Sequence, residues 1–295
     1  MDRLGRLIVL LALVAVVGAS HVAQGTPPSN EDTRRLAAAC QLSGVELREQ
    51  LGSECRAIVR PPFVIGGDLP ADELASWHAD TIRPAAQAML TSYIRTRPTQ
   101  PVRVLLFNTT ESYRRFSQEL FGTSKVSIYG YYRPNHRTLI ANLSTGGGTL
   151  VHELTHALLD FDFPDAPAWF NEGLASLHEA CRFRTSPHGV WLEGVVNWRL
   201  KGLQTVIRQG RLRPIASLVE DPAFRGPLEG ANYAQARYLC LYLQQRGLLE
   251  EFYREFRGHR AIDPQGLAAL ERVLGEASWQ SLDEDFRRWA LELAE

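Results

Sequence analysis

The sequence of 295 residues lacks a surplus of charge of either sign. It has 32 lysine and arginine side chains and 33 aspartate and glutamate side chains, which gives a formal net charge of -1. A domain that binds nucleic acid usually carries a clear basic excess, so nucleic acid is not an expected partner. Lysine is nearly missing, with Lys125 and Lys201 alone against many arginines, a bias typical of a GC-rich genome.

The sequence also lacks internal repeats and Cys-x-x-Cys pairs. Beyond its N-terminal segment, no apolar run approaches the ~18 residues of a spanning helix. These features exclude repeat architectures, zinc sites of that cysteine spacing, and a membrane span in the mature chain. Apolar residues make up 45% and charged residues 22%, which is ordinary for a globular protein and excludes intrinsic disorder.

The segment 1–25 has the pattern of a secretory signal peptide. Arg3 and Arg6 precede an apolar run from Leu7 to Val17, which small residues follow. The run is shorter than the ~20 residues that a membrane span needs. We therefore expect a secreted or periplasmic protein, cleaved within about 19–25, with an uncleaved anchor as the alternative because residue 2 is acidic.

Four cysteines remain in the mature chain, and an even number in an exported protein permits two disulfides. The local pair Cys40–Cys55 is the favoured first bridge, and Cys181–Cys240 then follows by elimination. In a cytosolic protein all four would instead be buried thiols.

Hydrophobic periodicity and turn residues predict the order of elements. Helices are predicted over 31–51, 71–95 (kinked at Pro84), 110–120, 149–161 and 168–181, and strands over 63–65, 102–107, 128–132 and 138–143. The last two strands form a hairpin. After an ambiguous stretch at 186–192, helices are predicted over 193–209, 214–220, 230–246, 248–257, 264–275 and 281–294.

The chemistry is concentrated in the pentapeptide from His152 to His156, which has the pattern HExxH. Two histidines four residues apart lie on one helix face, and their imidazoles can bind one Zn²⁺ at about 2.0–2.1 Å. Glu153 lies beside them, where it can reach a water molecule as general base rather than join the ligands. The sequence therefore predicts a zinc site on the helix 149–161.

A catalytic zinc needs a third protein ligand and an open position for water. The metzincin class is excluded because Leu159 and Asp162 stand where its motif needs glycine and histidine. Glu172, early in the next predicted helix, completes a His₂Glu set. Asp160, Asp162 and Asp165 are the alternative third ligands.

Two stretches resemble the gluzincin metallopeptidases, most closely their peptidase-MA-like branch. These are Thr149–Ala157, which contains the HExxH motif, and Pro167–Ala175, which contains Trp-Phe-Asn-Glu-Gly. The segment Tyr233–Leu239 is a weaker third match. The resemblance covers roughly 61–260.

The resemblance implies an α+β fold, in which a small mixed or antiparallel sheet packs on the HExxH helix and a mostly helical C-terminal subdomain follows. It implies His152, His156 and Glu172 as zinc ligands and Glu153 as base and proton shuttle. Tyr233 is the candidate that stabilises the oxyanion, against the alternative of an ordinary buried tyrosine.

The strand before the zinc helix is an edge strand in the family, which assigns that place to Thr138–Leu143 and lets it pair with an extended peptide. One departure concerns Ser176, which stands where the family has an aspartate that hydrogen-bonds a histidine ligand.

Other polar residues have simpler interpretations. We expect His136, His178 and His188 to be surface or structural residues, and Arg133 and Arg137 to be solvated turn residues rather than substrate contacts. The glycines at 146–148 lack the spacing and lysine of a phosphate loop, so they predict a flexible lead into the zinc helix.

These observations divide the chain into a signal peptide (1–25), an N-terminal helical extension (26–60), a zinc-binding catalytic core (61–185) and a helical C-terminal subdomain (186–295). The predicted function is that of an exported zinc metallopeptidase that acts on a peptide or protein substrate. The alternatives are a binding or scaffold protein that keeps the zinc-site fold without turnover, and an amidase that acts on cell-wall peptides.

Overall fold

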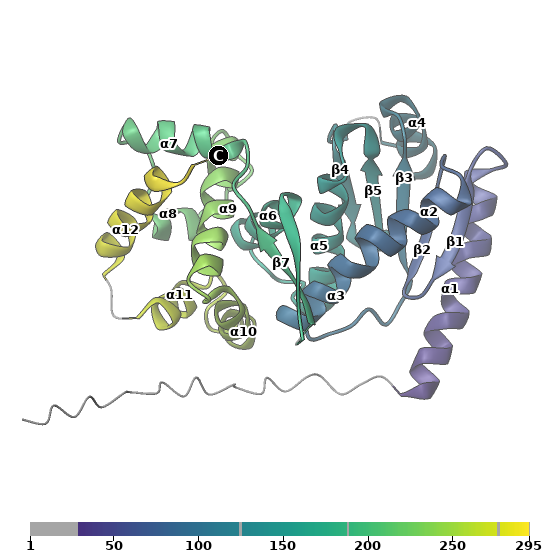
Figure 1. The fold of residues 1–295 in the computed structure, drawn as a ribbon, viewed down its shortest axis with the longest axis horizontal. Helices are drawn as coiled ribbons and strands as arrows, with labels where there is room; N and C mark the ends of the chain where they lie inside the picture. The colour runs from purple at the N-terminus through teal and green to yellow at the C-terminus, as the bar shows by residue number, and fades with distance from the viewer. Residues whose placement is uncertain (1–28, 124–125, 188, 276–277, 295) are drawn as a thin grey trace, which may run out of the picture.

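A computed structural model describes residues 29–123, 126–187, 189–275 and 278–294. The expected signal peptide and His188 lie outside these residues. The fold is α+β, as predicted: a five-stranded sheet with helices on both faces is followed by a mostly helical C-terminal part (Figure 1). No helix among the described residues is long and apolar enough to cross a membrane.

The main sheet has the strand order β1-β2-β3-β5-β4. Its strands are β1 (Arg56–Arg60), β2 (Phe63–Gly67), β3 (Val102–Phe107), β4 (Gly130–Arg133) and β5 (Thr138–Asn142). β2, β3 and β5 are parallel, while β1 and β4 are antiparallel to their neighbours. The segment expected to be a helical extension therefore also supplies β1.

The prediction that Thr138–Leu143 forms the edge strand is wrong. β5 pairs with β3 on one side and with β4 on the other, so its backbone groups are used within the sheet. The hairpin partner β4 forms the edge instead. The local sequence shows that two strands form a hairpin, but it does not show which of them the distant strand β3 will join.

Alternation along the strands separates two apolar layers. Val64, Leu105 and Ile140 pack with α1 (Asn30–Leu51) and α4 (Thr110–Phe121) on one face of the sheet. Ile65, Val104 and Leu139 pack on the other face with α3 (Arg83–Ser92) and α5 (Gly148–Asp162). The predicted zinc helix thus packs against β5 and β4 of the sheet, beside β4 in Figure 1.

The segment predicted as one kinked helix is divided into three pieces. α2 (Ala71–Trp77) passes into a π-helical stretch (His78–Ile82), which α3 follows. Pro84 lies in the first turn of α3. Proline lacks an N–H group and clashes with the carbonyl group four residues earlier, so it interrupts the hydrogen-bond pattern of a helix. Here the interruption falls in the π-helical stretch, whose wider turn precedes α3.

The rest of the chain begins with α6 (Ala168–Glu179). The ambiguous stretch is part of a hairpin, β6 (Cys181–Ser186) with β7 (Gly189–Gly194). The C-terminal helices are α7 (Arg199–Arg208), α8 (Ile215–Val219), α9 (Glu229–Gln245), α10 (Leu249–His259), α11 (Leu267–Leu274) and α12 (Trp279–Glu292). α6 contacts α9 closely, since a Cβ on Gly173 would lie 2.9 Å from the carbonyl oxygen of Ala236.

Neither expected disulfide is present, because all four cysteines are free thiols. Cys40 donates a weak hydrogen bond to the carbonyl of Pro62, at 3.6 Å, and packs with Cys55 in the apolar layer beneath α1. Cys240 is fully buried in α9. Burial raises the pKa of the Cys40, Cys55 and Cys181 thiols to about 11, so these side chains are ordinary apolar packing groups.

Candidate metal centre

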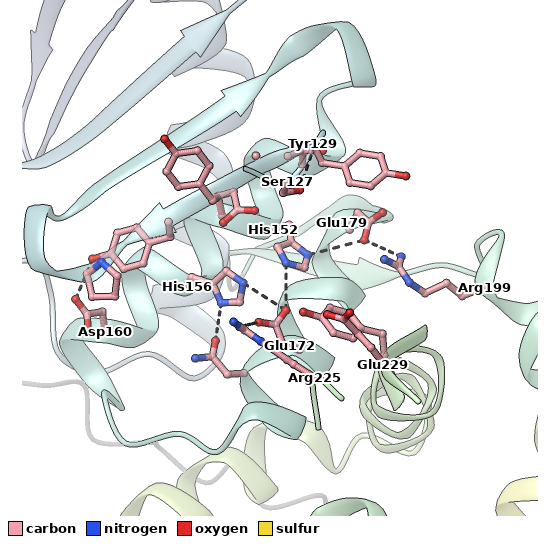
Figure 2. Close-up of a pocket in the computed structure, with 18 of the residues that line it drawn as sticks. Ser127, Tyr129, His152, His156, Asp160, Glu172, Glu179, Arg199, Arg225 and Glu229 are labelled. Atoms are coloured by element: carbon pink, nitrogen blue, oxygen red, sulfur yellow. Dashed lines mark hydrogen bonds and ion pairs between the residues drawn. The ribbon is translucent and has the colours of Figure 1, made fainter. Parts of the chain in front are cut away.

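Two helices joined by a short loop build the site. α5 carries His152 and His156 one turn apart, with ring centroids separated by 4.8 Å. Pro164 and Pro167 interrupt the helical pattern after α5, and Pro167 precedes the first residue of α6. This turn brings Glu172 of α6 back against the two histidines (Figure 2).

The three side chains have the geometry of a metal site. Glu172 Oε2 lies 3.5 Å from His152 Nε2 and 3.7 Å from His156 Nε2. The three ligand atoms lie within 4.8 Å of one another. Ligands at about 2.1 Å from a tetrahedral zinc ion lie about 3.4 Å apart. The observed separations fit this spacing, so the group could hold a metal ion.

None of the three alternative aspartates joins this group. Asp160 accepts a hydrogen bond from Tyr132. Asp162 is buried and binds Tyr253 and Arg257. The side chain of Asp165 is 80% exposed and faces Arg260. Among the described residues, the structure therefore brings only Glu172 to the histidine pair as a third ligand.

Each histidine presents its other ring nitrogen to a polar side chain. His156 Nδ1 lies 2.6 Å from Asn171 Oδ1, which can only accept, so this nitrogen carries the proton and Nε2 keeps its lone pair. His152 Nδ1 lies 3.8 Å from Glu179 Oε2, and Arg199 holds the same oxygen at 2.8 Å. Such outer partners fix the orientation of metal-binding imidazoles.

The sequence did not identify Asn171 or Glu179 as partners of the two histidines. It indicated Ser176 as the position of such a partner, but the buried hydroxyl of Ser176 has no hydrogen-bond partner in the described structure. Asn171 was detectable, because it stands beside Glu172 in the recognised motif. Glu179 lies two turns further along α6 and depends on Arg199 of α7, so no local signal marks it.

Arg225 fixes the second oxygen of Glu172. It lies in the segment between α8 and α9 and forms an ion pair with Glu172 Oε1, while Oε2 faces the histidines. Burial alone would raise the pKa of Glu172, but its contacts with His152, His156 and Arg225 lower it well below its usual range. Glu172 is therefore a carboxylate whose Oε2 faces both histidines.

Glu153 has a different environment from Glu172. Its side chain is 6% exposed and lies outside the three-ligand group. Burial raises the pKa of Glu153 to about 7, a change that the nearby His152 opposes. A carboxyl group with a pKa near neutrality can both accept and donate a proton.

The site lies at the bottom of a cleft of about 710 Å³. Tyr129 lies on one side of the histidines, and Arg225 and Glu229 lie on the other (Figure 2). Residues of β4 and Tyr233 of α9 also line the cleft. Burial, and then the charge of Glu172, raises the pKa of Tyr233, so its phenol stays protonated. Two walls around a possible metal site leave room for an extended ligand.

Glycines allow the close contacts around α5. A Cβ on Gly130 of β4 would lie 3.3 Å from Glu153 Cγ and 2.7 Å from Ile140 O, so a larger residue would push the edge strand away. A Cβ on Gly148 would lie 2.4 Å from the carbonyl oxygen of Glu179. Gly148, the first residue of α5, is thus required for packing.

The remaining histidines have structural or surface roles where they are described. His178 is fully buried, and its ring lies 3.0 Å from Thr155 Oγ1 and contacts the Tyr93 hydroxyl. His136 is exposed in a turn, with its ring against Phe121. Arg133 of β4 stacks on the same Phe121 ring, and Arg137 adopts the left-handed conformation that closes this turn.

Comparison of the chain with known protein families finds no matching family, and comparison with curated proteins finds no significantly similar one. The arrangement of the site's own residues therefore has to carry any functional conclusion.

Proposed function

We propose that the chain is an exported zinc metallopeptidase, with zinc held by His152, His156 and Glu172. One observation carries the proposal: two imidazole Nε2 atoms and one carboxylate oxygen converge at the spacing of tetrahedral ligands, with Glu153 beside them and outside the group. Zinc in such a site lowers the pKa of a water molecule toward ~7 and polarises a carbonyl group.

Glu153 acts as the general base in this proposal. Its buried carboxylate lies beside the three-ligand group, where it can take a proton from the attacking water and then deliver it to the leaving amine. A site that only holds a structural metal would have no use for this buried carboxyl. Glu153 is buried and forms no ion pair with any described residue, which supports hydrolysis over a scaffold role.

The cleft walls supply the remaining parts. The protonated phenol of Tyr233 is a donor for the oxyanion that forms during attack. The free edge of β4, rather than β5, is the strand with which an extended peptide would pair. The substrate would then lie between β4 and α9, above Glu153.

The first experiment measures zinc binding and peptide hydrolysis separately. Elemental analysis after desalting should give about one zinc per chain, and His156→Ala should lose most of it. Glu153→Gln should keep the zinc and lose nearly all hydrolysis of a broad peptide library. Zinc retention by His156→Ala, or zinc loss from Glu153→Gln, would contradict the assigned roles.

The same purified protein tests the substrate and the compartment. Incubation with the peptide library and, in parallel, with cell-wall peptide fragments distinguishes a peptidase from a cell-wall amidase. Full zinc occupancy with no cleavage of either would favour a binding protein. N-terminal sequencing of protein from the producing cells should start between Ser20 and Thr26, and an intact N-terminus would refute cleavage.

A further inference from the structure

A second cavity, also of about 710 Å³, lies outside the metal cleft. The first turns of α1, the turn at Pro61 and Pro62, α3 and the segment 97–99 surround it, and we call it the α1–α3 pocket. It opens where the two apolar layers of the core meet, since Leu36 packs with one layer and Phe63 with the other. None of the three metal-binding residues lines it.

The interior of the α1–α3 pocket is apolar. Phe63 and Leu158 are 3% and 0% exposed, and Leu36 and Leu90 are partly buried. The prolines of the surrounding turns add further apolar surface. A cavity of this size and lining suits an alkyl chain better than a polar ligand.

The border of this pocket is cationic, in contrast to the near-neutral chain. Arg35, Arg83 and Arg97 line it, and Asp32 is the one acidic residue among the described residues that do so. Arg35 is paired with Glu31. Within the described part of the chain, Arg83 and Arg97 have no carboxylate partner within 4.0 Å.

His78 also lines the pocket and lies in the same positive electrostatic field. Its pKa is lowered first by burial and then by the charges of Arg60 and Arg83. Guanidinium groups without protein partners are suited to bind carboxylate or phosphate oxygens in pairs. An anionic head group would therefore complement the positive charge of this border.

We propose that the α1–α3 pocket binds a single-chain amphiphile with an anionic head group. Its alkyl chain would lie against the partly exposed Leu36, Pro62 and Leu90. Its carboxylate or phosphate would bind at the border that Arg83 and Arg97 form. This site is separate from the metal centre and does not depend on the proposed peptidase activity. A free fatty-acid carboxylate and a lipid phosphate share this chemistry, and two probes distinguish them.

Isothermal titration calorimetry on the full chain tests this binding, with dodecanoate and dodecyl phosphate kept below the concentrations at which they form micelles. Saturable binding with one site per chain is expected. Removal of two methylene groups, as in decanoate, should weaken binding by about tenfold if the chain is buried. Dodecyl maltoside has the same chain with a neutral head group, and acetate and inorganic phosphate have no chain; all three should bind far more weakly.

The double variant Arg83→Gln/Arg97→Gln should weaken binding of the preferred anion by about tenfold or more, because each lost guanidinium removes a charge-assisted hydrogen bond. The matched control is Arg254→Gln, on the exposed face of α10, which should bind as the wild type does.

Three outcomes would overturn the proposal. They are the absence of saturable binding by either anion, equal binding of dodecyl maltoside, and full binding by the double variant. If His156→Ala rather than the double variant abolished binding, the anion would be bound at the metal centre.

Discussion

Replacement of Glu179 by glutamine tests whether an outer carboxylate controls the metal centre. Glu179 Oε2 lies 3.8 Å from His152 Nδ1 and 2.8 Å from an Arg199 nitrogen. The glutamine side chain has the same size, so α6 and the wall of the cleft should be preserved. The change removes the negative charge that faces His152 Nδ1, and with it the ion pair between Glu179 and Arg199.

The expected effect can be estimated from these distances. A histidine that binds a metal through Nε2 is neutral, so Glu179 acts on His152 as an acceptor facing Nδ1 and not as the partner of a full charge. Arg199 shares the same carboxylate oxygen, which reduces what that oxygen contributes to His152. Outer partners of metal-binding histidines contribute about 10–100-fold in affinity. We expect Glu179→Gln to weaken zinc binding by about tenfold, at the lower end of this range.

A chelator competition measures this change directly. Wild type and Glu179→Gln are titrated with a chromophoric zinc chelator at one pH, and thermal unfolding of the metal-free proteins confirms that both are folded. Glu193→Gln is the matched control, because it breaks another Glu–Arg pair, across the β6–β7 hairpin. Zinc affinity within twofold of wild type would refute a role for Glu179 in orienting His152.

Two further predictions concern the folded state. Burial lowers the pKa of His178 from 6.5 to about 3. Between these two pH values the folded state binds fewer protons than the unfolded state, so the free energy of unfolding falls as the pH falls. Metal-free wild type should lose about 2 kcal/mol more than His178→Gln between pH 6.5 and 5, as measured by urea unfolding, and equal losses would contradict this account. Gly148→Ala should lose about 1–3 kcal/mol by overpacking against the Glu179 carbonyl. Gly202→Ala, in open space on α7, should instead gain up to about 1 kcal/mol, and a neutral Gly148→Ala would show that the contact relaxes.

The three residues that could hold a metal ion were predictable because their placement is local. Helix geometry alone puts His152 and His156 on one face, and a short proline-containing turn leaves few positions for Glu172. The outer residues depend on tertiary structure. Arg199 and Arg225 reach the site from elements far along the chain, and no spacing rule connects them with α5.

The sheet shows the same limit. Strand positions followed from alternation, but the neighbour of each strand depends on pairing between distant segments, so β5 was assigned to an edge that β4 occupies. The predicted pairing of the cysteines is wrong for a related reason. An even number of cysteines permits bridges, but whether thiols meet depends on packing, and Cys40 lies against the carbonyl of Pro62 instead.

The compact segment from His152 to Glu172 has a consequence for folding. The three residues that could hold a metal ion all lie within this one helix–turn–helix, so little chain entropy opposes their meeting before the sheet forms. A metal ion can then bind the unfolded chain in addition to the native one. Binding to both states reduces the free energy by which the metal stabilises the native state. The metal should therefore raise the free energy of unfolding by less than its native-state affinity implies, and it should speed the formation of α5 and α6 during folding.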